Sequence, residues 1–186
     1  MNTVRTGEPR SRLSQTLSGA ELAVMRWIRR RESPAMTWVM RAVTRLGSGV
    51  SWTLLALVVA FAGMAVMGFG VGMGLSAAAG AISAAVVKRH VRRRRPHLTP
   101  EGPPSLVEIP DPYSFPSGHT TTAFTVFGGL LMVSSAWAAP CLVFACAVAC
   151  SRVYLGVHYP TDVVGGAVLG LALAAALNPV LESFFI

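Results

Sequence analysis

Between Val50 and Val87 the chain reads VSWTLLALVVAFAGMAVMGFGVGMGLSAAAGAISAAVV, and no residue in this run is charged. A helix needs about 20 apolar residues to cross the hydrocarbon core of a bilayer, so the run is long enough for two crossings. Alternate glycines from Gly68 to Gly74 mark the expected turn. The run therefore predicts two membrane helices, over residues 50–69 and 71–88.

The second half of the chain repeats this pattern. Residues 117–151 contain no Lys, Arg, Asp or Glu, and the run divides near Pro140, where a proline can occupy the first turn of a helix. A last apolar segment follows Pro160. The sequence thus predicts an all-α membrane protein with about five transmembrane helices, of which the last three cover residues 117–137, 140–157 and 161–182.

Composition agrees with a membrane protein and argues against a soluble domain. Of the 186 residues 53% are hydrophobic and 13% are charged, and the mean hydropathy is +0.55. Soluble domains carry roughly a quarter charged residues. The cysteines Cys141, Cys146 and Cys150 all fall in one predicted membrane helix, where we expect them to pack as small apolar residues without forming disulfides.

The first 48 residues have no apolar run long enough to span a bilayer. Apolar residues at helical spacing predict amphipathic helices within residues 17–48, lying in the membrane interface with their arginines toward anionic lipid headgroups. Residues 1–16 are predicted to be a disordered basic tail. The remainder, 17–186, is predicted to form a single membrane-embedded domain.

The distribution of positive charge predicts the orientation. Of sixteen Lys and Arg residues, nine precede residue 49, six lie between Lys88 and Arg95, and Arg152 is the last. With five crossings all three groups face one side, and the positive-inside rule makes that side cytoplasmic. We therefore predict a multi-pass protein of the bacterial cytoplasmic (inner) membrane, with its amino terminus and its site on the cytoplasmic face.

Three polar motifs occur where predicted helices meet this face. They read Lys88-x6-Arg95-Pro96, Pro116-Ser117-Gly118-His119 and Ser151-Arg152-x5-His158-x3-Asp162. Fixed cations and the amides of a helix start bind phosphate, and an imidazole can attack phosphorus or donate a proton. Asp162 could accept an N–H from His158 and leave the other ring nitrogen free. The motifs therefore predict phosphoryl chemistry.

Together the motifs resemble the signature of the type 2 phosphatidic acid phosphatase superfamily, over about residues 35–182. The resemblance implies a vanadium-haloperoxidase-like helical core and metal-independent hydrolysis of a phosphoric monoester, with no cofactor. It implies that His158 is the nucleophile and forms a phosphohistidine, that Asp162 orients it, and that His119 protonates the leaving oxygen. The phosphate-binding residues would be Lys88, Arg95, Ser117, Gly118 and Arg152.

The resemblance also implies a phosphorylated membrane lipid as substrate. Many bacterial members begin with one more span, which this sequence lacks, and small members without it resemble actinobacterial phosphatases of decaprenylphosphoryl-5-phosphoribose, which serve cell-wall precursor synthesis. Phosphatidic acid, phosphatidylglycerol phosphate and polyprenyl diphosphate remain alternatives, as do a lipid phosphotransferase using the same site and a non-catalytic transporter or scaffold. No nucleic-acid partner is expected, because Arg92 to Arg95 lacks interleaved aromatic residues.

Several other residues have plainer interpretations. Residues 92–115 hold six prolines and predict a stiffened loop that covers the site. Gly166-x3-Gly170 indicates close helix packing within the monomer first, and a homo-oligomer interface second. Acidic side chains in the loop are expected to be solvated, and the remaining basic ones to set topology or contact headgroups. These two groups are Glu101, Glu108 and Asp111, and Arg89, Arg92, Arg93 and Arg94. One of these arginines could instead bind a second substrate phosphate, and His90 and His97 are expected to be interfacial or packing residues.

Overall fold

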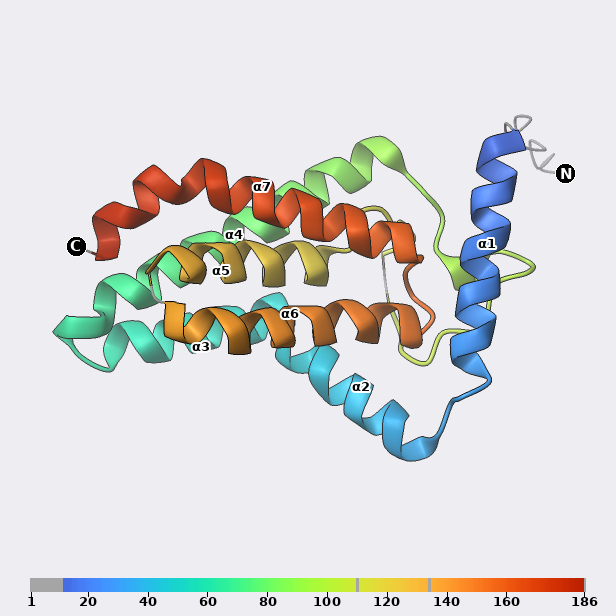
Figure 1. The fold of residues 1–186 in the computed structure, drawn as a ribbon, viewed down its shortest axis with the longest axis horizontal. Helices are drawn as coiled ribbons and strands as arrows, with labels where there is room; N and C mark the ends of the chain where they lie inside the picture. The colour runs from blue at the N-terminus through green and yellow to red at the C-terminus, as the bar shows by residue number, and fades with distance from the viewer. Residues whose placement is uncertain (1–11, 110, 134, 186) are drawn as a thin grey trace, which may run out of the picture.

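The structure, a computed structural model, describes residues 12–109, 111–133 and 135–185, and these residues are largely helical (Figure 1). No strand longer than an isolated bridge occurs in the described ranges. The helices are α1 (Arg12–Arg29), α2 (Pro34–Leu46), α3 (Gly49–Phe61), α4 (Met64–Val91), the short 3-10 helix η1 (Pro96–Leu98), α5 (Gly118–Val133), α6 (Ser135–Tyr154) and α7 (Pro160–Phe185).

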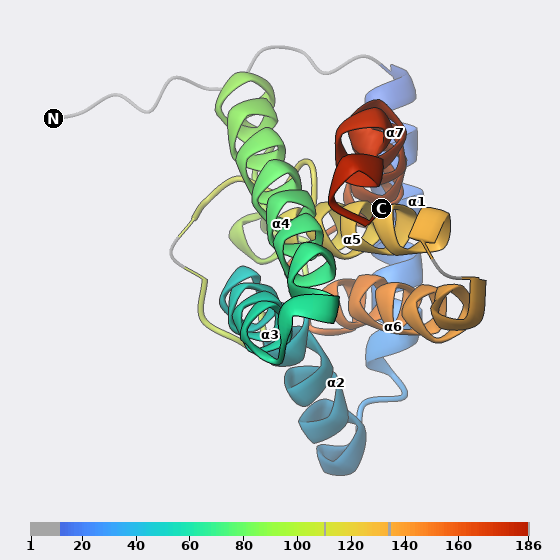
Figure 2. The ribbon, with the colours of Figure 1, turned by 90° about the vertical axis from the view of Figure 1, so that its left-hand side faces the viewer.

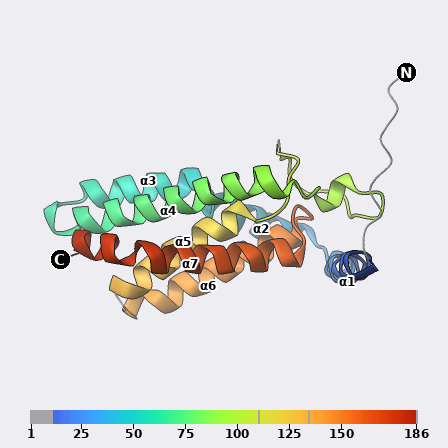
Figure 3. The ribbon, with the colours of Figure 1, turned by 90° about the horizontal axis from the view of Figure 1, so that it is seen from above.

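Helices α3 to α7 run side by side as an elongated bundle, and α1 lies across one of its ends (Figures 1 and 3). Seen along the bundle, α4 and α7 lie toward one side, with α3 and α6 below them and α5 between (Figure 2). The loop that joins α4 to α5 lies at the same end as α1 (Figure 1). The predicted all-helical membrane fold is confirmed.

The five predicted apolar helices form, but their lengths differ. By length and composition, two described helices can each cross a membrane, over Met67–Val91 and Pro160–Val180. A third span arises if α2 and α3, bent by 56°, count as one. Helix α5 has 16 residues, about 24 Å at the usual rise, which is shorter than a hydrocarbon core of about 30 Å.

The turn between α3 and α4 was predicted in the wrong place. The helices are joined at Ala62 and Gly63, and Gly63 has a φ of 150° that favours glycine. Gly70 is buried against α3, and a Cβ atom added there would lie 2.4 Å from the amide nitrogen of Ala60. This glycine serves close helix packing, so α4 begins several residues earlier than expected.

Two other boundaries also differ from the prediction. Helix α6 begins at Ser135, so Pro140 lies inside it and does not start it. Helix α1 begins at Arg12, so the last residues of the predicted tail are helical, whereas residues 1–11 lie outside the described ranges. Apolar composition predicts that a helix forms in each segment, but it does not locate the first or last residue of that helix to within a few positions.

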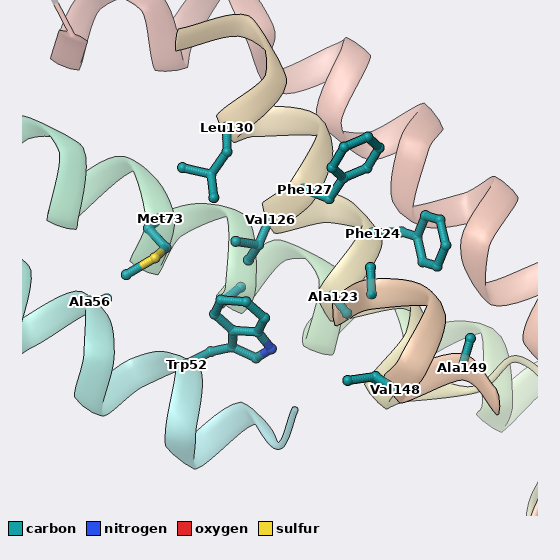
Figure 4. Close-up of a cluster of buried hydrophobic side chains, with 12 residues drawn as sticks. Trp52, Ala56, Met73, Ala123, Phe124, Val126, Phe127, Leu130, Val148 and Ala149 are labelled. Atoms are coloured by element: carbon teal, nitrogen blue, oxygen red, sulfur yellow. The ribbon is translucent and has the colours of Figure 1, made fainter. Parts of the chain in front are cut away.

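The core lies between α3, α4, α5 and α6 and contains Trp52, Phe127 and Val148 (Figure 4). The middle of α5 is buried on all sides, and α7 packs closely along it. A Cβ atom at Gly170 would lie 2.6 Å from the carbonyl oxygen of Thr121 on α5. The glycines of α7 therefore pack within the monomer, as predicted first, and this contact fixes the start of α7 relative to the start of α5.

The two amphipathic amino-terminal helices form as predicted, and the buried face of α1 packs on protein. Leu22 and Met25 are buried against Tyr159, which precedes α7. On α2, Thr37 and Thr44 are buried, whereas Trp38 is 72% exposed. Both helices thus form part of the wall at the end of the bundle where the polar motifs meet.

Candidate active site

A cavity of about 790 Å³ opens at the end of the bundle that carries α1, and the three polar motifs meet in it. Lys88 comes from the last turn of α4, Gly118 and His119 start α5, and Arg152 ends α6. The loop after α6 adds His158, which is possible because Gly156 turns the chain with a φ of +76°. The motif residues lining the cavity are Lys88, Arg95, Gly118, His119, Arg152 and His158.

The ring of His158 is almost fully buried, and each of its nitrogens faces a different charged group. Nη1 of Arg95 lies 3.1 Å from Nε2, and Oδ2 of Asp162 lies 3.5 Å from Nδ1. Because a guanidinium only donates hydrogen bonds, Nε2 must carry a lone pair and Nδ1 the proton. The 3.5 Å separation is longer than a usual hydrogen bond. The geometry thus assigns Nε2 as the nitrogen that can attack.

Burial lowers the pKa of His158 well below its ordinary value, and the nearby charges of Arg152, Arg95 and Lys88 lower it further. An imidazole that is buried among cations resists a further positive charge. The ring is therefore neutral at pH 7, which keeps the lone pair on Nε2 available.

Asp162 is completely buried and fixed on both carboxylate oxygens. Oδ2 accepts the backbone N–H of Tyr159 at 2.8 Å, and Oδ1 accepts Nη1 of Arg93 at 2.8 Å. The carbonyl oxygen of Asp162 accepts the N–H of Ser117 at 3.0 Å, which links the second motif to the third. This carboxylate therefore has little freedom to leave the ring of His158.

Arg93 and Glu21 belong to this network, and the sequence analysis did not find them. Nη2 of Arg93 pairs with Oε2 of Glu21 at 2.5 Å, and Oε1 of Glu21 accepts the N–H of Thr161. The guanidinium also lies over the ring of Tyr159, 4.0 Å from its centroid. The side chain of Arg93 is thus engaged by Asp162 and Glu21, a contact that the sequence analysis did not predict, and its role in topology stays a prediction. The sequence did hold one signal of this contact: Glu21 is an acidic residue beside the apolar positions Leu22 and Met25 of α1.

The two buried arginines of the motifs are held differently. Arg95 donates from Nη1 to the carbonyl oxygen of Val157 and from Nε to that of Asp111. Arg152 donates from Nη1 to Oγ1 of Thr44, while its buried Nε has no hydrogen-bond partner among the described residues. A buried donor without a partner is costly. The Nε of Arg152 is therefore a donor that a bound anion could satisfy.

Asp111 was predicted to be a solvated loop charge, and the structure contradicts this. Its Oδ2 lies 2.5 Å from Nζ of Lys88 and 3.3 Å from Nη2 of Arg95. Partial burial acts to raise the pKa of Asp111, but hydrogen bonds from Lys88 and from the N–H of Tyr113 outweigh it and lower that pKa. The carboxylate therefore stays ionised, and an incoming phosphate must compete with it for two of the motif cations.

The second motif contributes backbone to the cavity lining at Gly118, whereas the side chain of Ser117 points elsewhere. Ser117 is fully buried and does not line the cavity, and its hydroxyl accepts a hydrogen bond from Oγ1 of Thr120. Gly118 does line it, and a Cβ atom there would meet Ala84 only at an ordinary contact of 3.8 Å. Packing within the protein thus does not demand glycine at 118.

The proline-rich loop covers one side of the cavity, as predicted. It is packed in place: the N–H of Leu106 donates to the carbonyl of Leu155, and the carbonyl of Leu106 accepts Nε and Nη2 of Arg41. A bridge between Arg94 and Tyr113 joins the two ends of the loop. Any lid motion of this loop stays a prediction.

The other predicted residues lie as follows. Within the described ranges there is no group of three or more His, Cys, Asp or Glu side chains that could hold a metal ion. The three cysteines are free and lie on α6. His90 is exposed, and its ring contacts the carbonyl of Val86 within its own helix. The absence of a cofactor remains an expectation.

Comparison with known proteins agrees with this geometry. The model of the PAP2 superfamily matches residues 65–184. Decaprenylphosphoryl-5-phosphoribose phosphatase of Mycobacterium tuberculosis is 33% identical over 153 residues, which cover 80% of this chain and 82% of that protein. The phosphatase of the same name from Mycolicibacterium smegmatis is 37% identical over 136 residues, or 72% of each chain. A solved PAP2-type phosphatidylglycerolphosphate phosphatase from Bacillus subtilis has a TM-score of 0.77 and 28% identity, covering 94% of this chain and 89% of its own.

Proposed function

The chain belongs to the PAP2 superfamily and is a membrane phosphatase that hydrolyses phosphoric monoesters of lipids, and from that premise we propose that its substrate is a polyprenyl-linked sugar phosphate. Decaprenylphosphoryl-5-phosphoribose is the best candidate, because two relatives named for it match most of this chain. The proposal would place the enzyme in cell-wall precursor synthesis. The observation that carries the chemistry is one cavity that joins two histidines to three motif cations.

In the proposed first step, Nε2 of His158 attacks phosphorus. A bond forms between nitrogen and phosphorus while the bond from phosphorus to the ester oxygen breaks, and His119, protonated when the anionic substrate binds beside it, gives its proton to that oxygen. Lys88, Arg95 and Arg152 would stabilise the charge on the phosphoryl oxygens. Arg95, which bonds Nε2 in the resting site, would transfer its hydrogen bond to the phosphate and so release the lone pair.

In the second step His119 acts as a base. It removes a proton from a water molecule whose oxygen attacks phosphorus, and the bond to Nε2 breaks. Inorganic phosphate leaves, and His158 regains its neutral form. Asp162 would hold Nδ1 in place through both steps, because its own oxygens are fixed by Arg93 and the N–H of Tyr159. A charged partner behind an imidazole stabilises the cation that forms on it.

A phosphate-release assay on the purified protein tests the substrate. Polyprenylphosphoryl phosphoribose, phosphatidylglycerol phosphate, polyprenyl diphosphate and phosphatidic acid would be compared by kcat/KM. The proposal expects the first to be the best substrate, and a higher kcat/KM for any of the others would reject it. Phosphate release that required an added lipid alcohol acceptor would instead indicate a phosphotransferase.

The intermediate can be trapped separately. With substrate labelled in the phosphoryl group, the wild-type protein quenched in alkali should carry an acid-labile label, as a phosphoramidate does. The variant His158→Ala should carry none. A label that survives acid, or that remains in His158→Ala, would place the covalent bond on another residue.

The proposed mechanism uses fixed cations and no metal ion. Activity should therefore persist in excess EDTA, with kcat changed by less than about twofold, since each phosphoryl oxygen would meet a cationic side chain. Loss of turnover in EDTA and its recovery with magnesium would show that the metal-free mechanism is wrong.

We also propose a cytoplasmic site in the bacterial inner membrane. Both amino-terminal helices and the segment from Lys88 to Arg95 lie at the same end of the bundle, so the basic groups gather on one face (Figure 1). In a variant whose three native cysteines are replaced by alanine, Glu101→Cys would introduce a thiol on the exposed part of the loop. A membrane-impermeant maleimide should label it only after permeabilisation, and labelling in intact cells would contradict the orientation.

A further inference from the structure

The cavity extends well beyond the motif residues, toward α2 and the start of α3. Its volume of about 790 Å³ falls within the range of about 300 to 1,000 Å³ that encloses drug-sized ligands. A phosphoryl group alone would leave most of it empty. The added wall is polar and consists of Arg41, Thr44, Arg45, Ser48 and Ser51.

These wall residues recur at intervals of three or four, so on α2 they form one helical face. The side of α2 that points away from these residues carries large apolar residues that are exposed, such as Val39 and Leu46. In a membrane protein such residues face lipid. Helix α2 therefore separates a polar cavity from the surrounding lipid, as expected at the place where a phospholipid headgroup enters.

The cavity carries more positive charge than the binding of one phosphate needs. Five cationic side chains line the cavity against two acidic ones, Glu108 and Asp111. Three of the cations belong to the motifs, and Arg41 is engaged by the carbonyl of Leu106. Arg45 lines the cavity, yet its side chain makes no ion pair or hydrogen bond with any described residue.

The backbone at Arg45 is held firmly. Its carbonyl accepts the hydroxyl of Ser51 at 2.7 Å, and the hydroxyl of Ser48 caps α3 by accepting the N–H of Ser51 at 3.2 Å. The corner between α2 and α3 thus fixes the backbone from which the exposed side chain of Arg45 reaches the cavity, and its guanidinium donors have no partner among the described residues. Such a group suits the oxygens of a phosphodiester.

We propose that Arg45 forms a second anion subsite, which binds a phosphodiester of the substrate while the motif residues bind its terminal phosphomonoester. The substrate class is then a lipid with two phosphates joined by a polyol spacer. This inference rests on the proposed function as a lipid phosphatase and narrows its substrate. Decaprenylphosphoryl-5-phosphoribose and phosphatidylglycerol phosphate both belong to this class, whereas phosphatidic acid carries a single phosphate.

The test compares Arg45→Gln with the wild type on both kinds of lipid, in micelles of uncharged detergent. The selectivity ratio, kcat/KM for a two-phosphate lipid divided by kcat/KM for phosphatidic acid, should fall about tenfold, the effect of one charge-assisted contact. Most of the loss should lie in KM. Arg89→Gln is the matched control, because Arg89 is exposed at the end of α4 and lies outside the cavity lining.

Each outcome decides something. A ratio that falls in Arg45→Gln, recovers in Arg45→Lys and holds in Arg89→Gln supports the subsite, and an unchanged ratio in Arg45→Gln overturns it. Wild-type preference for phosphatidylglycerol phosphate over the polyprenyl lipid would reject the proposed polyprenyl substrate while keeping the subsite. Preference for phosphatidic acid over both would overturn both proposals.

Two further arms complete the experiment. If Arg45→Gln does not fold, binding of the two-phosphate lipids to His158→Ala and to His158→Ala with Arg45→Ala replaces turnover, and equal affinities overturn the subsite. The second arm adds phosphatidylglycerol to the wild type and to Arg45→Gln. Inhibition that depends on Arg45 without a change in the selectivity ratio would assign the guanidinium to a neighbouring bilayer lipid and overturn the proposal.

Discussion

Asp111 lines the cavity and Asp162 lies behind it against His158, and the two are held by different parts of the fold. Asp162 starts α7, is fully buried, and is fixed by Arg93 and a backbone N–H. Asp111 lies on the proline-rich loop, and its side chain is 38% exposed. The first carboxylate lies against the ring of His158, whereas the second binds two cations that line the cavity.

The difference shows how one residue type takes two roles in one site. The bundle provides rigid support because α5 packs closely on α7 near Asp162, where a Cβ atom added at Gly166 would lie 2.9 Å from the carbonyl oxygen of Ser117. The loop holds Asp111 mainly through polar contacts, which a phosphate of higher charge can replace. A half-exposed ion pair of this kind contributes little stability, so its effect should appear in ligand binding.

The largest expected effect is on the bundle side. Asp162→Asn should lower kcat by about 10² to 10⁴-fold, because an amide can present its own N–H to Nδ1 and so favour the wrong tautomer of His158. Steady-state phosphate release measures this. Arg94→Ala, which alters an exposed loop residue, is the control and should stay within about twofold of the wild type. A kcat for Asp162→Asn within tenfold of the wild type would show that Asp162 does not orient the ring.

A smaller effect should come from the helix that crosses the end of the bundle. Glu21→Gln removes the charge that holds Arg93 against Asp162, so kcat should fall about tenfold and the pH profile of kcat should shift, with KM changing less. Glu32→Gln serves as the control, since Glu32 is exposed and pairs only with Arg29 in a neighbouring turn. Equal kinetics in the two variants would limit Glu21 to a structural role.

On the loop side the expected effect has the opposite sign. Asp111→Asn removes the carboxylate that competes for Lys88 and Arg95, so the inhibition constant of inorganic phosphate should fall by about three- to tenfold. Competitive inhibition of substrate hydrolysis measures it. Weaker or unchanged inhibition would mean that the carboxylate remains in place when phosphate binds, and the two aspartates would then act alike.

The smallest expected effect concerns protonation. Because the pKa of His158 is lowered, its ring should remain neutral as the pH falls from 7 through 6.5, the ordinary value. The unfolded chain takes up this proton first, so the stability gained from the neutral ring is complete above pH 6.5 and declines below it. Nitrogen chemical shifts of labelled histidine, assigned with His158→Gln, measure the titration. A midpoint at or above 6.5 would contradict the burial seen here.

Helices and motifs were predictable from the sequence, because long uncharged runs have few alternatives in a membrane and the motifs fall at their ends. The short 16-residue α5 and the turn at Gly63 were not, since hydropathy does not distinguish a glycine that turns the chain from one that packs two helices. Glycines such as Gly70 look the same in either role until the neighbouring helix is placed.

Within the site, the sequence predicted the motif residues that meet in the cavity and Asp162 behind them, but not the residues that hold Asp162 or the part of the wall that comes from α2. Arg93 is one of several adjacent arginines, and nothing local marks it as the one that reaches Asp162. Glu21 and Thr44 lie far from the motifs in sequence, and their contacts arise only when α1 and α2 fold over the end of the bundle. Asp111 was misjudged because loop acids are usually solvated.

Lys88 is the only lysine in the chain, and its ammonium group lies in the cavity beside Asp111. Apart from the terminal amine, acylating reagents that target primary amines therefore have a single possible attachment point. A fluorophore coupled there would sense occupation of the pocket from inside it, and a lipid analogue bearing an activated ester would become tethered within it. Because the other basic side chains are arginines and histidines, amine-acylating reagents can modify this enzyme at one side chain, whereas in most proteins they react with many surface lysines.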